Sequence, residues 1–247
     1  MLTLAIEQST SVSSTALLNH GDVVAEHTWK NSDFPNQHIF STVLPDLFKE
    51  TPVEPTDIDI FAVGLGPGSF SGLRISLSLA SALALPGQKR VFGVSSGEAL
   101  AWDLFREKLI SPVVIVGDAR RGRLWFAQFL ATDGLLKMET PYCLIKFEEL
   151  SGMLDKHSIV ASPDWDRIGE KLIESNPGHT TFIEEKRVPR ARTIGELALR
   201  KIGNSRPQDL FDRTPGRRSL GEVCLAKSEP LTPIYLHPPV FVKPRFE

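Results

Sequence analysis

The sequence contains few cysteines, with only Cys143 and Cys224 among its 247 residues. The two lie far apart and match neither a zinc-ligand spacing nor a Cys-x-x-Cys redox motif. A small scaffold held together by several disulfides is therefore excluded, and the pattern favours reduced thiols in a cytoplasmic protein. A single disulfide between the two cysteines is the alternative that the sequence leaves open.

Long apolar runs and a strong net charge are also absent. No apolar stretch approaches the ~20 residues of a membrane-spanning helix. No basic segment precedes an apolar one at the start of the chain, so we expect neither a membrane contact nor a signal peptide. The formal net charge is −2. The chain therefore lacks an overall positive field, and any contact with nucleic acid would be local or made by a partner.

The one glycine-rich stretch, residues 66–72, lacks two phosphate-binding signatures. A Walker A loop requires a lysine, and no lysine lies between Lys49 and Lys89. A dinucleotide-binding fingerprint would require a glycine at the position of Ser71. Backbone amides of a glycine-rich turn can still bind phosphate. We nevertheless predict that this stretch is a tight turn from a strand into a helix, which permits close packing.

Paired histidines are missing as well. No two of the six histidines are three to five residues apart, so no helix presents the two imidazoles of a zinc-peptidase site. No nucleophile-elbow pattern supports a Ser-His-Asp hydrolase. We therefore expect no metal, no cofactor and no catalytic residue.

The patterns that are present predict strands followed by helices and strands in alternation. Residues 73–85 alternate partly like a strand, but their length, their Ala and Leu content and the Pro86-Gly87 stop favour a helix. Pro45 should bend the helix in which it lies. The predicted strands of the first half are 2–7, 13–18, 23–29, 59–65 and 91–94, and the predicted helices are 36–50, 73–85 and one that begins at Ser95-Ser96-Gly97-Glu98.

The second half of the chain opens at Pro112 and predicts a related unit. We expect a helix capped by Thr193 with Glu196, and a loop over residues 206–229. The other elements expected here are strands at 113–116, 124–130 and 159–161 and a short helix at 147–154. The fold class is therefore α/β with two ribonuclease-H-like lobes, 1–108 and 109–247. The sequence shows no obvious internal repeat, so this division rests on the order of elements.

Four stretches of the sequence resemble motifs of the TsaB (YeaZ) family. The most specific is Gly64-Leu65-Gly66-Pro67-Gly68-Ser69-Phe70-Ser71-Gly72-Leu73-Arg74, which follows the family's GxGPGSFTGxR signature nearly throughout. The others are Leu4-Ala5-Ile6-Glu7-Gln8-Ser9-Thr10, Asp118-Ala119-Arg120-Arg121-Gly122 and Pro233-Ile234-Tyr235-Leu236. Their order along the chain matches that of the family.

The resemblance implies a two-lobed fold of the actin, sugar-kinase and Hsp70 type. It also implies a non-catalytic scaffold or activator that binds the catalytic paralogue TsaD, with the ATPase TsaE, for threonylcarbamoylation of adenosine 37 in tRNA. The chain would reach tRNA through this complex and could form a homodimer when alone. TsaD carries a paired-histidine metal site, and the histidine spacing of this chain does not provide one.

A nucleotide site would lie at the end of the first strand. In nucleotide-binding relatives of this fold, an acidic residue there helps to position a metal-bound phosphate, and Glu7 stands where the family usually has Asp. Relatives of this fold that bind adenosine usually present a Gly-Gly pair in the second lobe, and this chain contains no consecutive Gly-Gly pair. We therefore favour a carboxylate bound by nearby backbone amides. The weak nucleotide or phosphate candidates are Glu7, Ser9, Thr10, Gly66 and Gly68.

Short groups of arginines give a second set of candidates. Arg120, Arg121 and Arg123 lie at a predicted turn and could contact RNA phosphates, although solvated loop charge is the commoner explanation. No aromatic residues are interleaved with them, which argues against a single-strand-binding module.

The strongest functional signal is excess apolar surface on two helices. The side of helix 71–85 that carries Ser78 and Ala82 has one charge, Arg74, where a solvated face would carry several. The helix at 36–50 has an apolar arc wider than ~100°. Burial by the second lobe would explain both, but we favour a protein interface. Its predicted residues are His38, Phe40, Val43, Leu44, Leu47, Phe70, Arg74, Ser78 and Ala82.

Three rival functions remain open at this point. An actin-like ATPase or kinase needs an adenosine pocket, and a metallopeptidase needs the missing histidine pair. A stand-alone RNA-binding module would reveal itself by salt-dependent binding of tRNA.

Overall fold

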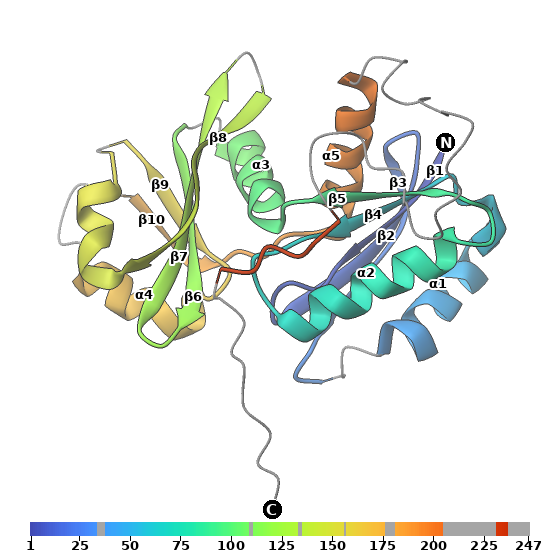
Figure 1. Cartoon of the computed structure of the whole chain (residues 1–247), viewed down its shortest axis with the longest axis horizontal. Helices are drawn as coiled ribbons and strands as arrows, with labels where there is room; N and C mark the ends of the chain where they lie inside the picture. The colour runs from blue at the N-terminus through green and yellow to red at the C-terminus, as the bar shows by residue number, and fades with distance from the viewer. Residues whose placement is uncertain are drawn as a thin grey trace, which may run out of the picture.

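The chain forms two lobes, each built around one five-stranded sheet. The computed structural model describes residues 1–33, 38–108, 111–132, 135–155, 157–175, 181–204 and 231–236. Figure 1 shows the two lobes side by side, with helix α3 (Ser96–Lys108), helix α5 (Ala191–Asn204) and the segment 231–236 between them. The predicted loop at 206–229, and Cys224 within it, lie outside the described residues.

The first sheet has the strand order β3-β2-β1-β4-β5. Strands β1, β2 and β3 form an antiparallel meander, and β4 and β5 then run parallel to β1. Its strands are β1 (Leu2–Glu7), β2 (Val12–Asn19), β3 (Asp22–Lys30), β4 (Ile60–Gly64) and β5 (Arg90–Val94). The helices of this half are η1 (Ile39–Val43), α1 (Leu44–Glu50), η2 (Pro55–Asp57), α2 (Phe70–Ala84) and α3 (Ser96–Lys108).

The second sheet repeats this topology. Its order is β10-β9-β6-β7-β8, so its five strands occupy the same places in chain order as those of the first sheet. The strands are β6 (Val113–Arg120), β7 (Arg123–Thr132), β8 (Leu135–Lys146), β9 (Ile159–Ser162) and β10 (Thr181–Lys186), and the helices are η3 (Phe147–Met153), α4 (Trp165–Glu174) and α5 (Ala191–Asn204). The repeat confirms the predicted pair of ribonuclease-H-like lobes.

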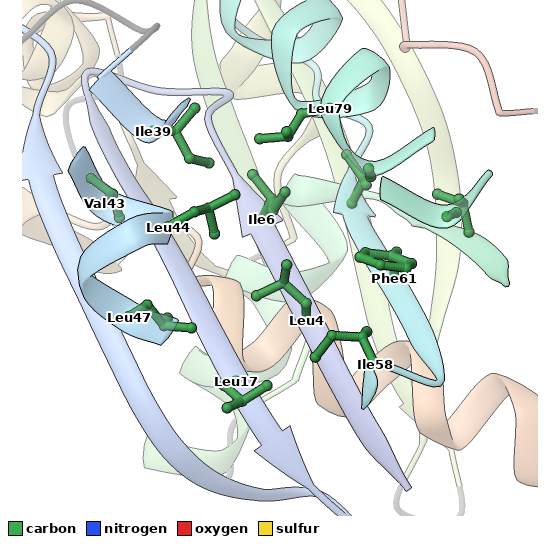
Figure 2. Close-up of a cluster of buried hydrophobic side chains, with 14 of the residues drawn as sticks. Leu4, Ile6, Leu17, Ile39, Val43, Leu44, Leu47, Ile58, Phe61 and Leu79 are labelled. Carbon is green, nitrogen blue, oxygen red and sulfur yellow. The ribbon is translucent and has the colours of Figure 1, made fainter. Parts of the chain in front are cut away.

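The two faces of the first sheet are covered from different parts of the chain. One face packs against η1, α1 and α2, and Figure 2 shows Leu4, Ile6 and Phe61 of the sheet among the side chains of these helices. The other face packs against α3 and α5. Helix α5 follows the second sheet in sequence and yet covers the first. The division of the chain at residue 108 stays a prediction.

Helix α3 and the segment 231–236 contact both lobes. Trp102 of α3 belongs to the cluster beneath α5, whereas Leu104 packs against the second sheet. Within the segment 231–236, Leu231 packs on the first-lobe core and Leu236 on the second-lobe core. In the described part of the chain, no helix is both long and apolar enough to span a membrane.

Several boundaries differ from the prediction. Pro45 does not lie inside one continuous α-helix: a π-helical turn, η1, directly precedes α1, and Pro45 lies in the first turn of α1. The predicted cap at Thr193 is wrong, because α5 already begins at Ala191. Helix α4 and strands β8 and β10 were not predicted.

Candidate functional site

The carboxylate of Glu7 ends β1 and is fully buried. The backbone N–H of Ser9 donates to its Oε1 at 2.6 Å, and the hydroxyl of Ser96 donates to its Oε2 at 2.7 Å. Burial raises the pKa of Glu7 above its ordinary value, and the hydrogen bonds from Ser9 and Ser96 counteract this rise. Both carboxylate oxygens are thus bound within the chain: one by a nearby backbone amide, as the sequence favoured, and the other by the distant side chain of Ser96.

The glycine-rich turn lies directly against the end of β1. A Cβ at Gly68 would lie 2.0 Å from the carbonyl oxygen of Ser9, and one at Gly72 would lie 2.1 Å from that of Gln8. The N–H of Ser69 donates to the Ser9 carbonyl at 2.7 Å. The Oγ of Ser69 then caps α2 by accepting from the N–H of Gly72. The turn is tight because its backbone packs on backbone, which confirms the predicted role of its glycines.

The structure brings most of the predicted phosphate candidates together. Glu7, Ser9 and Gly68 are in contact, and the N–H of Gly66 donates to the same Ser96 hydroxyl that binds Glu7. Thr10 lies at the β1–β2 turn, where its hydroxyl donates to the carbonyl of Val12 at 2.8 Å. Most of the polar atoms at this point therefore bind one another, but the buried hydroxyl of Ser9 has no hydrogen-bond partner among the described residues. Nucleotide binding here stays a prediction.

Four residues at helical spacing form an exposed ridge along α2. Phe70, Arg74, Ser78 and Ala82 follow one another at intervals of four, and all four are exposed. We call them the α2 ridge. The guanidinium of Arg74 lies 4.8 Å from the centroid of the Phe70 ring, and Arg74 is the one charged residue of the helix. Among the described residues, the second lobe therefore does not bury the α2 ridge.

The preceding helical segment contributes less to this surface than predicted. Val43, Leu44 and Leu47 lie in the first-lobe core with at most 6% of their surface exposed, and Figure 2 shows them directed toward the sheet. Their inclusion in a partner interface is corrected, because their side chains already pack on β1 and β2. Phe40 is 48% exposed and His38 is partly buried. The wide apolar arc thus reflects burial in the chain's own core.

The structure adds Tyr235 to the surface near the α2 ridge. Its ring centroid lies 5.3 Å from that of Phe70, and half of its surface is exposed. The neighbouring N–H of Ile234 donates to the carbonyl of Leu65 at 2.8 Å, which holds this segment beside the glycine-rich turn. The sequence analysis identified Pro233-Ile234-Tyr235-Leu236 as a motif. No local sequence pattern, however, could predict that Tyr235 contacts Phe70, which is far away in the chain.

The predicted arginine cluster lies at the turn between β6 and β7. Arg120, Arg121 and Arg123 are all exposed there. Asp118 accepts a hydrogen bond from the N–H of Arg120 at 2.7 Å, much as Glu7 accepts from Ser9 at the end of the first strand of the other sheet. At or near the end of the first strand of each sheet, a carboxylate thus accepts a hydrogen bond from the backbone N–H two residues further on.

Comparisons with known proteins agree with the motifs. A family model described as "TsaD: tRNA N6-adenosine threonylcarbamoyltransferase" matches residues 36–175. The tRNA threonylcarbamoyladenosine biosynthesis protein TsaB of Escherichia coli (strain K12) is 34% identical over 135 residues, which cover 52% of this chain and 55% of that protein. TsaB of Bacillus subtilis (strain 168) is 32% identical over 143 residues, covering 57% and 60% respectively. The matched region thus spans little more than half the length of these relatives.

A solved structure resembles the whole described fold. YeaZ from Pseudomonas aeruginosa superposes with a TM-score of 0.73 at 23% sequence identity, covering 95% of this chain and 99% of that one. At this level of identity the likeness supports the fold.

Proposed function

Because this chain belongs to the TsaB (YeaZ) family, we propose that it is a non-catalytic subunit in the synthesis of threonylcarbamoyladenosine in tRNA. It binds the catalytic paralogue TsaD, in a system that includes the ATPase TsaE, and holds TsaD in a competent state. The observation that carries the proposal is the α2 ridge, an exposed helix face that lacks the charges of a solvated surface. Without TsaD, the same face would serve a homodimer.

The composition of the α2 ridge suits contact with another helix. A solvated helix face carries several charged side chains, whereas this one carries Arg74 alone. Ser78 and Ala82 are small, and their exposed positions would let the backbone of a partner helix approach closely. At the other end, Phe70 and Tyr235 present apolar rings that would be covered on binding.

The engagement of Glu7 supports a role without catalysis. An actin-like ATPase would need a carboxylate available to position a phosphate-bound metal ion. Here the Glu7 oxygens accept from Ser9 and Ser96, and its full burial disfavours the charged form that a metal ion requires. Titration of the chain with ATP and magnesium by calorimetry separates the two functions, since an ATPase should show saturable heat.

The proposal is tested by placing an arginine on the α2 ridge. Ser78→Arg and Ala82→Arg should change the free energy of unfolding by less than about 0.5 kcal/mol, because both residues are exposed in the monomer. Both variants should nevertheless fail to co-elute with TsaD in gel filtration, because a bulky charge prevents close approach of helices.

The matched control is Ser151→Arg, the same substitution at an exposed position of the second lobe. It should leave both the melting temperature and co-elution with TsaD unchanged. Normal binding of TsaD by Ser78→Arg and Ala82→Arg would show that the partner docks elsewhere.

A further inference from the structure

The turn between β6 and β7 places arginines in a backbone conformation that other residues adopt more easily. Arg120 has φ 64°, Arg121 has φ 53° and Gly122 has φ 70°, all in the left-handed region. That region costs most L-residues roughly 1–2 kcal/mol and is usually occupied by Gly, Asn or Asp in hairpin turns. Turn geometry therefore does not account for the arginines at positions 120 and 121.

Three cations also face one another across adjacent strands. Arg120 of β6 is the register partner of Arg123 on β7, and Arg123 is the register partner of Lys146 on β8. Neighbouring strands lie ~4.8 Å apart, and like charges directly opposite one another destabilise a sheet. All three residues are exposed. Together with Arg121 they form what we call the basic edge of the second sheet.

The nearby carboxylates neutralise one part of this edge. Asp118 forms ion pairs with Arg120 at 3.3 Å and with Arg167 at 3.4 Å, and Arg167 also pairs with Asp164. Glu149 accepts a hydrogen bond from the backbone N–H of Lys146. Within the part of the chain that the structure describes, the side chains of Arg121, Arg123 and Lys146 form no ion pair. Three unpaired cations thus remain at one end of the sheet.

We propose that the basic edge binds the backbone phosphates of RNA. Two local rules of stability, turn conformation and cross-strand charge, are broken at the same point, and such departures are expected at functional sites. Each departure adds positive charge, and arginine and lysine side chains contact phosphates without reading base sequence. The choice of RNA over an acidic protein rests on the proposed function in tRNA modification.

The test measures binding of a fluorescently labelled, unmodified tRNA transcript to the purified chain alone, by anisotropy over a series of salt concentrations. The variant combines Arg121→Asn, Arg123→Gln and Lys146→Gln. Asparagine tolerates the left-handed conformation and the other two positions are exposed, so the fold should be retained, which a thermal melt checks. Each lost phosphate contact should lower the slope of log affinity against log salt by about 1, giving a decrease of about 3 in all.

The matched control is Lys137→Gln, which removes an exposed lysine at the opposite end of β8. It should leave affinity and salt slope close to those of wild type, whereas the combined variant should bind at least about tenfold more weakly at low salt. Unchanged binding by the combined variant, an equal loss in the control, or no binding of tRNA by the wild-type chain at low salt would each overturn the proposal.

A parallel titration with ATP distinguishes RNA from a free nucleotide. If the combined variant loses ATP binding while tRNA binding is unaffected, the phosphate ligand is a nucleotide and the assignment to RNA is wrong. Because the chain is assayed without TsaD, these results can be read even if co-elution with TsaD fails and the proposed function falls.

Discussion

Among single residues, Glu7 shows most directly how burial and hydrogen bonding act against each other. Burial raises the pKa of its carboxyl, whereas hydrogen bonds from Ser9 and Ser96 favour the charged form and lower it, with a net rise. The folded protein therefore binds this proton more tightly than the unfolded chain does. The stability contributed by the group is complete below the unfolded pKa and is lost as pH rises through the raised folded pKa.

Replacing Glu7 with glutamine should remove this dependence on pH. We expect the free energy of unfolding of wild type to fall relative to that of Glu7→Gln as pH rises from about 4 to about 8. Urea denaturation of both proteins across this range measures the difference. Glu174→Gln, at an exposed glutamate, should run parallel to wild type. A difference that changes in the opposite direction would mean that the folded pKa of Glu7 is lowered.

The hydrogen-bond partner of a residue could be predicted where that partner is close in sequence. The family motif and the residue type predicted a carboxylate bound by nearby backbone, and the Ser9 N–H fulfils this two residues later. The second partner, Ser96, lies 89 residues away, beyond any local pattern. The same limit explains Val43 and Leu47, because a helical repeat shows which residues share a face but not whether the chain itself covers that face.

Whole elements were predicted best where apolar periodicity and a stop signal agree. Helix α2 was expected at 73–85 and occupies Phe70–Ala84, because Pro86-Gly87 ends it and Ser69 caps its start. Helix α5 was placed too late in the chain, since Thr193 and Glu196 imitate a capping box. In the structure the Thr193 hydroxyl instead donates to Asp103 of α3 at 2.8 Å. The Thr193 side chain thus binds a residue of another helix and does not cap α5.

Asp103 should therefore hold α5 in position. It is almost fully buried and also pairs with Arg190 at 3.1 Å and with Arg106 at 3.3 Å. Asp103→Ala would leave these donors without their acceptor, and we expect a loss of about 2–3 kcal/mol in the free energy of unfolding. The control is Glu185→Ala, which breaks an exposed ion pair and should cost less than about 1 kcal/mol. Equal losses in urea denaturation would contradict the anchoring role.

For the molecule as a whole, the two-lobed α/β fold was predictable, whereas strands β8 and β10 and the closure of the lobes were not. The order of strands and helices gave two lobes of one design, and both sheets have that design. Nothing local indicates that α5 returns to the first sheet, because its apolar residues would suit either lobe. Ala191, Ile194 and Leu197 pack beneath the first sheet, where they complete its core.

The first 108 residues alone should therefore fold poorly. A fragment 1–108 leaves Ala5, Leu18 and Ala62 uncovered on the face that α5 protects, so we expect no cooperative thermal transition and strong binding of a hydrophobic dye. Joining residues 190–204 to this fragment through a flexible linker should restore the transition. A cooperative transition of the fragment 1–108 without α5, at the melting temperature of the linked protein, would show that the lobe is complete without this helix.

Because α5 covers the first sheet, the first lobe cannot be completed during translation until residues 191–204 have been synthesised. At roughly 5–20 residues per second, translation from residue 108 to residue 191 takes about 4–17 seconds. During this time α5 is not yet available to pack on its face of the first sheet. That face carries Leu18, Phe92 and Val94 as well as the small side chains of Ala5, Ala16 and Ala62. The nascent chain thus keeps part of this apolar face exposed to solvent until α5 has been synthesised.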